Sequence, residues 1–186
     1  QGGARDFDTA DVWMFVGANP TISKSIGIPC MNPGKHLHDA VARGVKLVII
    51  DPRRSEIARV AAIHLQPKPG EDPTILAGML RIILDEGLGD REFLASNARG
   101  HEALRRAIEP FTPEYVERRA DVRAADLLRA ARLYASTRNA GANAGTGPNM
   151  APRGNLTEYL LLALKTVCGH YKRAGERLSN PGVFMP

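Results

Sequence analysis

An aspartate stands at the point where a buried strand is expected to end. Residues 45–50 are apolar except for Lys46 and rich in β-branched side chains, which is typical of a strand buried on both faces. Asp51, Pro52 and Arg53 follow it directly. In an open α/β sheet, ligands bind beyond the carboxyl ends of the strands, where a carboxylate can accept hydrogen bonds from a ribose diol. This segment therefore predicts a nucleotide-shaped site.

A second polar segment, at residues 67–72, follows a short strand predicted at residues 63–66. It ends at Asp72, which precedes a proline and an apolar stripe at helical spacing. Asp72 is therefore predicted to be the N-cap of a helix. Because the carboxyl ends of parallel strands meet at one edge of a sheet, Asp51 and Asp72 should lie on the same side of it.

Two glycine-containing segments are expected at the same edge. Gly17 follows a strand predicted at residues 12–16, and Gly145 follows residues 140–144, which are predicted to be a strand from their position. A glycine has no Cβ, so the backbone can approach a ligand closely at either point. Each segment can equally be an ordinary turn or loop, and the residues alone leave that choice open.

The rest of the pattern supplies helices for both sides of such a sheet. Strands that alternate with helices predict βαβ units, whose strands pair in parallel. The predicted fold is therefore α/β, a mostly parallel Rossmann-like sheet with helices on both faces. Asn155 and Glu158 form a capping-box pattern at the start of the last long helix. Helices are expected at residues 35–43, 55–62, 73–86, 91–98, 113–119, 124–135 and 156–168.

The composition describes one mildly basic globular domain. The chain has 186 residues, a hydrophobic share of 44% and a net charge of +5, which suits an anionic cofactor or an ordinary solvated surface. Its two cysteines, Cys30 and Cys168, form no CxxC pair and are predicted to be ordinary thiols, and its histidines lack metal-ligand spacing. No apolar run is long enough to span a membrane. The absence of GxGxxG after the first strand argues against a nicotinamide enzyme.

Four stretches carry a resemblance that covers nearly the whole chain. In order they are VWMFVGANPTIS, DPRRSEIARVAAIHLQPKPGEDPTILAGML, GTGPNMAPRGN and CGHYKRAG. Together they resemble the molybdopterin oxidoreductases, the family of dimethyl sulfoxide reductase and formate dehydrogenase. The resemblance implies a molybdopterin guanine dinucleotide cofactor carrying molybdenum or tungsten. It implies that Asp51 contacts a ribose, Asp72 the guanine base, and Arg53 with the backbone near Gly17 a phosphate, while the Gly145 segment closes over the cofactor.

The candidate cofactor-binding residues all belong to the four strand-end segments. They are Gly17, Ala18, Asn19, Pro20, Ser23, Asp51, Pro52, Arg53, Ser55, Lys68, Gly70, Asp72, Gly145, Thr146, Gly147, Asn149 and Met150. Members of the family often carry glutamine where this chain has Met150, so a polar contact is not expected there.

The resemblance also implies what this stretch lacks. The metal ligand and any iron–sulfur cluster cysteines would lie before Gln1, so no catalytic or metal-binding residue is predicted. Residues 1–169 are predicted to be the cofactor-binding domain, and residues 170–186 a tail leading toward a following domain. Expected partners are the other domains of the same polypeptide and the small-molecule substrate of a cytoplasmic enzyme, with no nucleic acid. The isolated domain should be catalytically silent. The alternative is a non-catalytic nucleotide-binding or regulatory domain.

Overall fold

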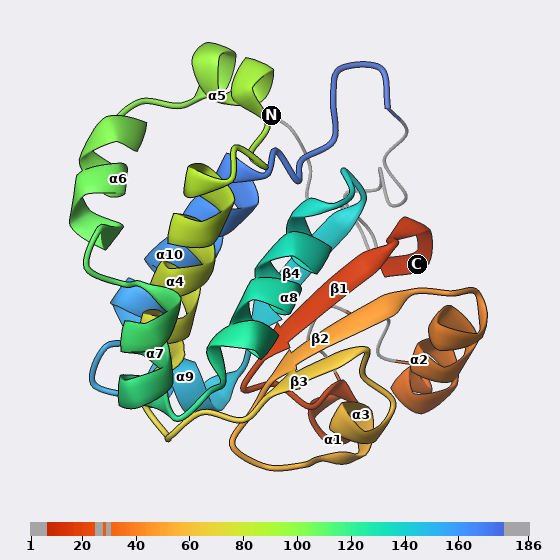
Figure 1. Cartoon of the computed structure of the whole chain (residues 1–186). Coiled ribbons are helices and arrows are strands. Elements are labelled where there is room, and N and C mark those ends of the chain that lie inside the picture. The colour runs from red at the N-terminus through yellow and green to blue at the C-terminus, as the bar shows by residue number, and fades with distance from the viewer. Residues whose placement is uncertain (1–6, 25–27, 29–30, 177–186) are drawn as a thin grey trace.

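The computed structural model describes residues 7–24, 28 and 31–176, and a four-stranded sheet forms its centre (Figure 1). The strands lie in the order β3-β2-β1-β4, and every pairing is parallel. The parallel α/β fold and its predicted strands are confirmed, with the second and third strands each one residue shorter than expected. Their bounds are β1 Val12–Val16, β2 Lys46–Ile50, β3 Ile63–Leu65 and β4 Ala140–Ala144.

Alternate side chains of the strands enter two separate cores. Met14, Val48 and Ile50 pack on one face of the sheet, whereas Phe15 and Ile49 pack on the other. All five are fully buried, as expected for a parallel sheet covered on both faces. The helices that complete the first core are α4 (Asp72–Asp85), α7 (Pro113–Ala120), α8 (Ala124–Ala135) and α10 (Gly154–Val167). Those of the second are α2 (Pro33–Ala42) and α3 (Glu56–Arg59).

Strand β4 has a glycine where a large side chain of the neighbouring strand β1 lies. A Cβ built on Gly141 would collide with the ring of Trp13, which lies opposite it on β1. The Trp13 indole Nε1 also donates to the Asn143 side-chain oxygen at 3.1 Å. Gly141, one of the small residues that hide this strand in the sequence, is therefore what makes room for the tryptophan.

Two short helices occupy segments that the sequence predicts as a turn and a loop. Helix α1 (Pro20–Ser23) follows β1, and its N-cap Asn19 accepts a hydrogen bond from the Thr21 backbone N–H at 3.2 Å. Helix α9 (Thr146–Met150) follows β4. Both are single turns placed directly after a strand, too short to leave a periodic signal in the sequence.

Several helix ends differ from the prediction. Helix α2 starts at Pro33 rather than residue 35, because the Asn32 side chain caps it by accepting from the Lys35 N–H at 3.2 Å. Helix α3 covers only four of the residues 55–62, since the chain leaves it to enter β3. The predicted cap at Asp90 is confirmed. Its carboxylate accepts from the Phe93 N–H at 2.9 Å and begins α5 (Arg91–Asn97), which α6 (His101–Ile108) follows.

Two predicted N-caps are wrong. Asp72 is the first residue of α4, and Glu71 holds the N-cap position. The Glu71 carboxylate accepts from the Thr74 hydroxyl at 2.5 Å instead of capping a backbone N–H. The capping box at Asn155 does not form either, because α10 begins at Gly154, two residues before the predicted start, and Arg153 holds the N-cap position. A Cβ at Gly154 would collide with the backbone of Asn149, so this glycine allows the close entry into the helix.

The chain after α10 stays in contact with the domain. Gly169, with φ of +65°, ends the helix in the left-handed conformation. His170 is fully buried, and its Nε2 lies 2.9 Å from the carbonyl oxygen of Thr137. The Arg173 guanidinium donates to the Asp90 carboxylate at 2.7 Å. The first residues of the predicted tail are therefore held by Thr137, which precedes β4, and by the N-cap of α5.

Cys168 is buried beneath this segment. Burial raises the pKa of its thiol to about 12, so it stays protonated and unreactive near neutral pH. Cys30 and residues 177–186 lie outside the described residues. The division of the chain at residue 169 stays a prediction.

Candidate functional site

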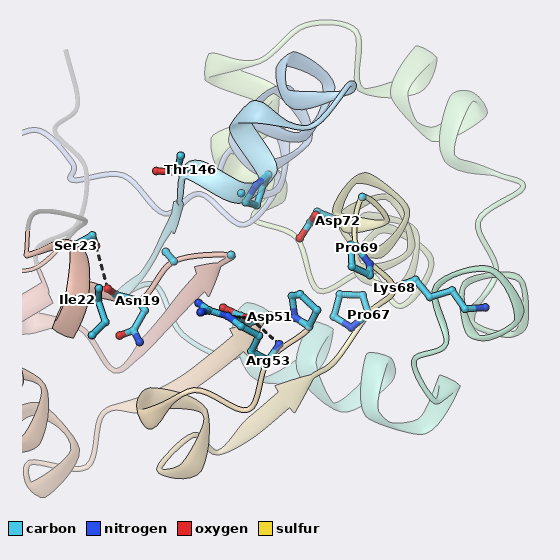
Figure 2. Close-up of a pocket in the computed structure, with 16 residues that line it drawn as sticks. Asn19, Ile22, Ser23, Asp51, Arg53, Pro67, Lys68, Pro69, Asp72 and Thr146 are labelled. Atoms are coloured by element: carbon cyan, nitrogen blue, oxygen red, sulfur yellow. Dashed lines mark hydrogen bonds and ion pairs between the residues drawn. The ribbon is translucent and has the colours of Figure 1, made fainter.

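A pocket of about 450 Å³ opens at the edge of the sheet where the strands end (Figure 2). All four strand-end segments contribute to it, as parallel pairing requires. It is lined by Gly17, Ala18, Asn19, Ile22, Ser23, Asp51, Pro52, Arg53, Pro67, Lys68, Pro69, Gly70, Asp72, Thr146, Gly147 and Pro148. Its volume is in the roughly 300–1,000 Å³ range of small-molecule sites.

Asp51 is almost fully buried at the end of β2 and is held by its own loop. One carboxylate oxygen accepts from the Arg53 backbone N–H at 2.8 Å and lies 3.6 Å from the Arg53 guanidinium. The Asp51 carbonyl lies 2.9 Å from His64 Nε2 on β3, and the Gln66 amide donates to the Pro52 carbonyl at 2.7 Å. The loop after β2 is thus held by its own hydrogen bond and by two side chains from the neighbouring strand segment, His64 and Gln66. These contacts orient the carboxylate before any ligand binds.

Asp72 is the second buried carboxylate of the pocket, and its surroundings differ. Burial raises the pKa of the Asp72 carboxyl above its usual range, and the negative charges of Asp51 and Glu71 raise it further. Such a group gains from a donor that would pair with it. Figure 2 shows Asp51 and Asp72 on the same side of the pocket, on the loop after β2 and the first turn of α4.

Glu71 is the neighbour of Asp72 but belongs to a different set of contacts. Its carboxylate accepts from the Arg119 guanidinium on α7 at 2.8 Å and lies 3.9 Å from the Arg153 guanidinium. Burial tends to raise the pKa of Glu71, but the hydrogen bonds from Thr74 and Arg119 outweigh it and lower the pKa. Glu71 therefore anchors the start of α4 to the other helices and leaves the pocket to Asp72.

Lys68 lies in the turn between β3 and α4. Its backbone N–H donates to the Ala120 carbonyl at 2.9 Å, which ties the turn to α7. In Figure 2 its side chain extends away from Asp51 and Asp72. Arg53, in contrast, has its guanidinium 3.6 Å from the Asp51 carboxylate.

The segments after β1 and β4 meet through their backbones. Gly17 has a φ of +54°, and a Cβ on it would collide with the Pro148 ring. A Cβ on Gly145 would collide with the Gly17 carbonyl oxygen. Gly147, in contrast, has open space where a Cβ would stand. Gly17 and Gly145 therefore allow the two segments to pack against each other. Gly147 is the glycine of these two segments that leaves room for a ligand.

The side-chain oxygen and amide of Asn19 both make hydrogen bonds to other residues of the chain. Its side-chain oxygen accepts from the Thr21 N–H and hydroxyl, and its amide donates to the Glu56 carboxylate at 2.8 Å. Glu56 is the first residue of α3, so this bond joins the loop after β1 to the segment after β2. Asn19 lines the pocket while its side chain bonds to a residue of a second segment of the pocket.

Several predicted site residues lie outside the lining. Pro20 is buried in α1, and the Ser55 hydroxyl is buried without a hydrogen-bond partner. Met150 is exposed but does not line the pocket. Gly145 and Asn149 serve the backbone packing described above. The pocket also contains residues that the sequence did not single out: Ile22, Pro67, Pro69 and Pro148. Each of the four adjoins a predicted site residue in the sequence, Ile22 being next to Ser23.

Among the residues that the structure describes, no group of three or more His, Cys, Asp or Glu side chains could hold a metal ion. Over the same residues, no helix has the length and apolar character needed to cross a bilayer.

Comparison with known proteins identifies the family, although no protein-family model matches the chain. The chain is 33% identical to formate dehydrogenase H of Escherichia coli (strain K12) over 165 residues, which are 89% of this chain and 22% of that protein. The chain belongs to the molybdopterin oxidoreductase family.

Other members of the molybdopterin oxidoreductase family match most of the chain. F420-dependent formate dehydrogenase 2 subunit alpha of Methanococcus maripaludis is 31% identical over 73% of this chain and 19% of its own length. The structure of acetylene hydratase from Pelobacter acetylenicus covers 96% of this chain and 24% of that one, with a TM-score of 0.82 at 24% identity, which shows the shared fold. This chain thus spans about a fifth to a quarter of the length of the molybdopterin oxidoreductases that it matches.

Proposed function

We propose that this chain is the cofactor-binding domain of a molybdenum or tungsten oxidoreductase and holds the guanine dinucleotide part of molybdopterin. The proposal rests on one observation. In a chain of this family, four strand-end segments surround a pocket that contains two buried carboxylates, Asp51 and Asp72. Ligands of open α/β sheets bind at this edge.

The residues present fit that group chemically. A guanine base offers an N1–H and an exocyclic amine as donors, and a ribose offers two hydroxyls, so both ends call for acceptors such as Asp72 and Asp51. The Arg53 guanidinium suits a phosphate. Gly70 and Gly147 leave open space beside the backbone where a Cβ would stand, which lets a ligand approach closely. When bound, the cofactor would supply the redox chemistry through its metal, and this chain would bind and orient the nucleotide end.

We propose that this domain does not select the substrate of the complete enzyme. Relatives named formate dehydrogenase and acetylene hydratase share this stretch, so the same domain serves proteins with different names and reactions. We infer that residues elsewhere in the polypeptide select the small-molecule substrate and supply the metal ligand. Any iron–sulfur cluster would also be bound there.

Site-directed variants of the complete polypeptide test the proposal. Asp51→Ala and Asp72→Asn should each remove a hydrogen bond to the cofactor, which weakens its binding by about 1–3 kcal/mol. Elemental analysis for molybdenum and tungsten, with measurement of the GMP released by acid hydrolysis, should show a loss in both. Asp85→Asn, on the exposed end of α4, is the matched control and should retain the cofactor.

The outcomes separate the alternatives. Cofactor content unchanged in both pocket variants would refute the assignment. A wild-type polypeptide that binds guanine nucleotide but contains no molybdenum or tungsten would instead favour a non-catalytic nucleotide-binding or regulatory domain.

The isolated 186-residue chain should be folded, colourless and free of stoichiometric metal. A cofactor that spans several domains loses most of its contacts here, and each lost charged hydrogen bond is worth about 1.5–3 kcal/mol. Elemental analysis near one metal per chain, or dye-linked reductase activity from this chain, would contradict the proposal of a catalytically silent domain.

A further inference from the structure

Helix α10 has an exposed face unlike that of the other long helices. Its exposed residues are Asn155, Leu156, Tyr159 and Leu162, and none of them is charged. Leu156, Tyr159 and Leu162 are 44%, 59% and 53% exposed, and their spacing of three places them along one side of the helix. We call these three residues the α10 face.

Helices α2 and α8 provide the contrast. Lys35 and His38 are the large exposed side chains of α2, and Arg129 and Arg132 are those of α8. Single exposed apolar residues need no explanation, but three large ones on one uncharged helix face are typical of an interaction site.

The α10 face is joined to the pocket through α9. Thr146, Gly147 and Pro148 of α9 line the pocket, and Met150 at its end is 84% exposed. Helix α10 starts four residues later and packs against α9. The helix that carries the α10 face therefore packs directly on a helix that lines the pocket.

The length of the relatives indicates what covers this face. This chain spans 22% of formate dehydrogenase H and 24% of the acetylene hydratase chain, so more than three quarters of each relative lies outside it. A neighbouring domain of one polypeptide is present at a high effective concentration. An uncharged apolar helix face suits such a permanent contact, because charged residues are depleted at the centres of stable interfaces.

We propose that the α10 face docks a neighbouring domain of the same polypeptide, which thereby sits beside the pocket rim. This inference rests on the proposed function, in that it takes the chain to be one domain of a longer enzyme. The occupant is a domain within the polypeptide, and a second copy of the chain is the competing outcome of the test.

Hydroxyl-radical footprinting of the complete polypeptide tests the docking directly. The reactivity of Tyr159, Leu162 and Val60 is measured in the native protein and normalised to the denatured protein. Val60 is 52% exposed and follows α3, on the opposite face of the sheet, so it is the matched control. Tyr159 and Leu162 should be protected at every protein concentration, and Val60 should react freely. Reactive Tyr159 and Leu162, or protection that disappears on dilution of a self-associating protein, would overturn the proposal.

A variant pair completes the experiment. Leu162→Glu should restore the reactivity of Tyr159 by placing a charge in the contact, whereas Val60→Glu should leave Tyr159 protected. Far-UV circular dichroism checks that both variants are folded, and Tyr159 still protected in folded Leu162→Glu would count against the proposal. Protection of Tyr159 in a polypeptide that contains no cofactor would refute the proposed function and leave the docking surface standing.

Discussion

The two sides of the pocket are built by different means, although both stand at the same edge of one sheet. On one side, the segments after β1 and β4 contact each other through Gly17, Gly145 and the Pro148 ring. On the other, the loops after β2 and β3 bring two buried carboxylates, Asp51 and Asp72, beside the pocket. The first side is set by steric fit and the second by charge and hydrogen bonding.

The difference separates residues that shape the pocket from residues that can recognise a ligand. The Gly17 backbone N–H donates to the Ile50 carbonyl at 2.7 Å, and the Gly145 N–H donates to the Val16 carbonyl at 2.8 Å. Both glycines therefore extend the sheet's own hydrogen bonds. Their substitution should affect folding first, whereas changes to the carboxylates should affect binding more than folding.

The largest effect on stability is expected at the glycine contact. In Gly145→Ala, the new methyl group would collide with the Gly17 carbonyl oxygen, which is backbone and cannot turn away. Overpacking of this kind costs about 1–3 kcal/mol. Urea titration should show this loss in the free energy of unfolding. Gly147→Ala, with open space around the added carbon, is the control. Equal losses of unfolding free energy in the two variants would show that the close contact between Gly145 and Gly17 does not limit stability.

A smaller loss is expected for Asp51→Ala. The substitution removes the acceptor of the Arg53 backbone N–H, and a hydrogen bond of this kind contributes about 0.5–1.5 kcal/mol. Asp51→Asn keeps an oxygen at the same place and should retain most of the stability. Urea titration of both variants measures the difference. If Asn were as destabilising as Ala, the negative charge rather than the local hydrogen bond would hold this loop.

Asp72→Asn should change stability in the opposite direction. Burial, with repulsion from Asp51 and Glu71, raises the pKa of Asp72 in the folded protein, so its ionisation destabilises the fold. Between the unfolded pKa of about 3.9 and the raised folded value, wild-type stability falls as pH rises. The variant should therefore be more stable than wild type at pH 7, and the gap should close as the pH is lowered toward about 4. Urea titrations across this range would count against the assignment if the gap did not change with pH.

The smallest effect on stability is expected at the hydrogen bond between Asn19 and Glu56, which joins the two sides of the pocket. Glu56→Ala removes the exposed hydrogen bond from the Asn19 amide, so thermal unfolding should shift only slightly, because exposed contacts contribute little. Glu56→Gln keeps an oxygen acceptor for the Asn19 amide and should restore the wild-type midpoint. A large drop in the unfolding temperature for Glu56→Ala would mean that this bond holds the sides together.

Much of the fold was predictable because its signals are local. The apolar run of β2, the proline and stripe of α4 and the cap at Asp90 are each contained in a few consecutive residues. The contact of Gly145 with Gly17 was not predictable, since it depends on β4 lying next to β1 in space. Ile22 lines the pocket beside the predicted Ser23, and both belong to α1, a single turn too short to leave a periodic signal in the sequence.

Asp72 shows how a small shift in register changes the meaning of a residue. As an N-cap, its carboxylate would accept a hydrogen bond from a backbone N–H of α4. One position further along, it lies inside the helix start and beside the pocket, while Glu71 bonds to Thr74 and Arg119. Sequence patterns place helix ends only to within one or two residues, which is the margin that separates these roles.

The position of Trp13 gives this domain an internal optical reporter. It is the single tryptophan of the chain, it is buried in the second core, and its indole N–H is bonded to Asn143 on the neighbouring strand. Its ring also meets Phe7 edge-on at 5.3 Å between centroids. Indole emission moves to longer wavelengths in water, so separation of β4 from β1 should be visible as a red shift. Fluorescence can thus follow the opening of this one strand pair without any label.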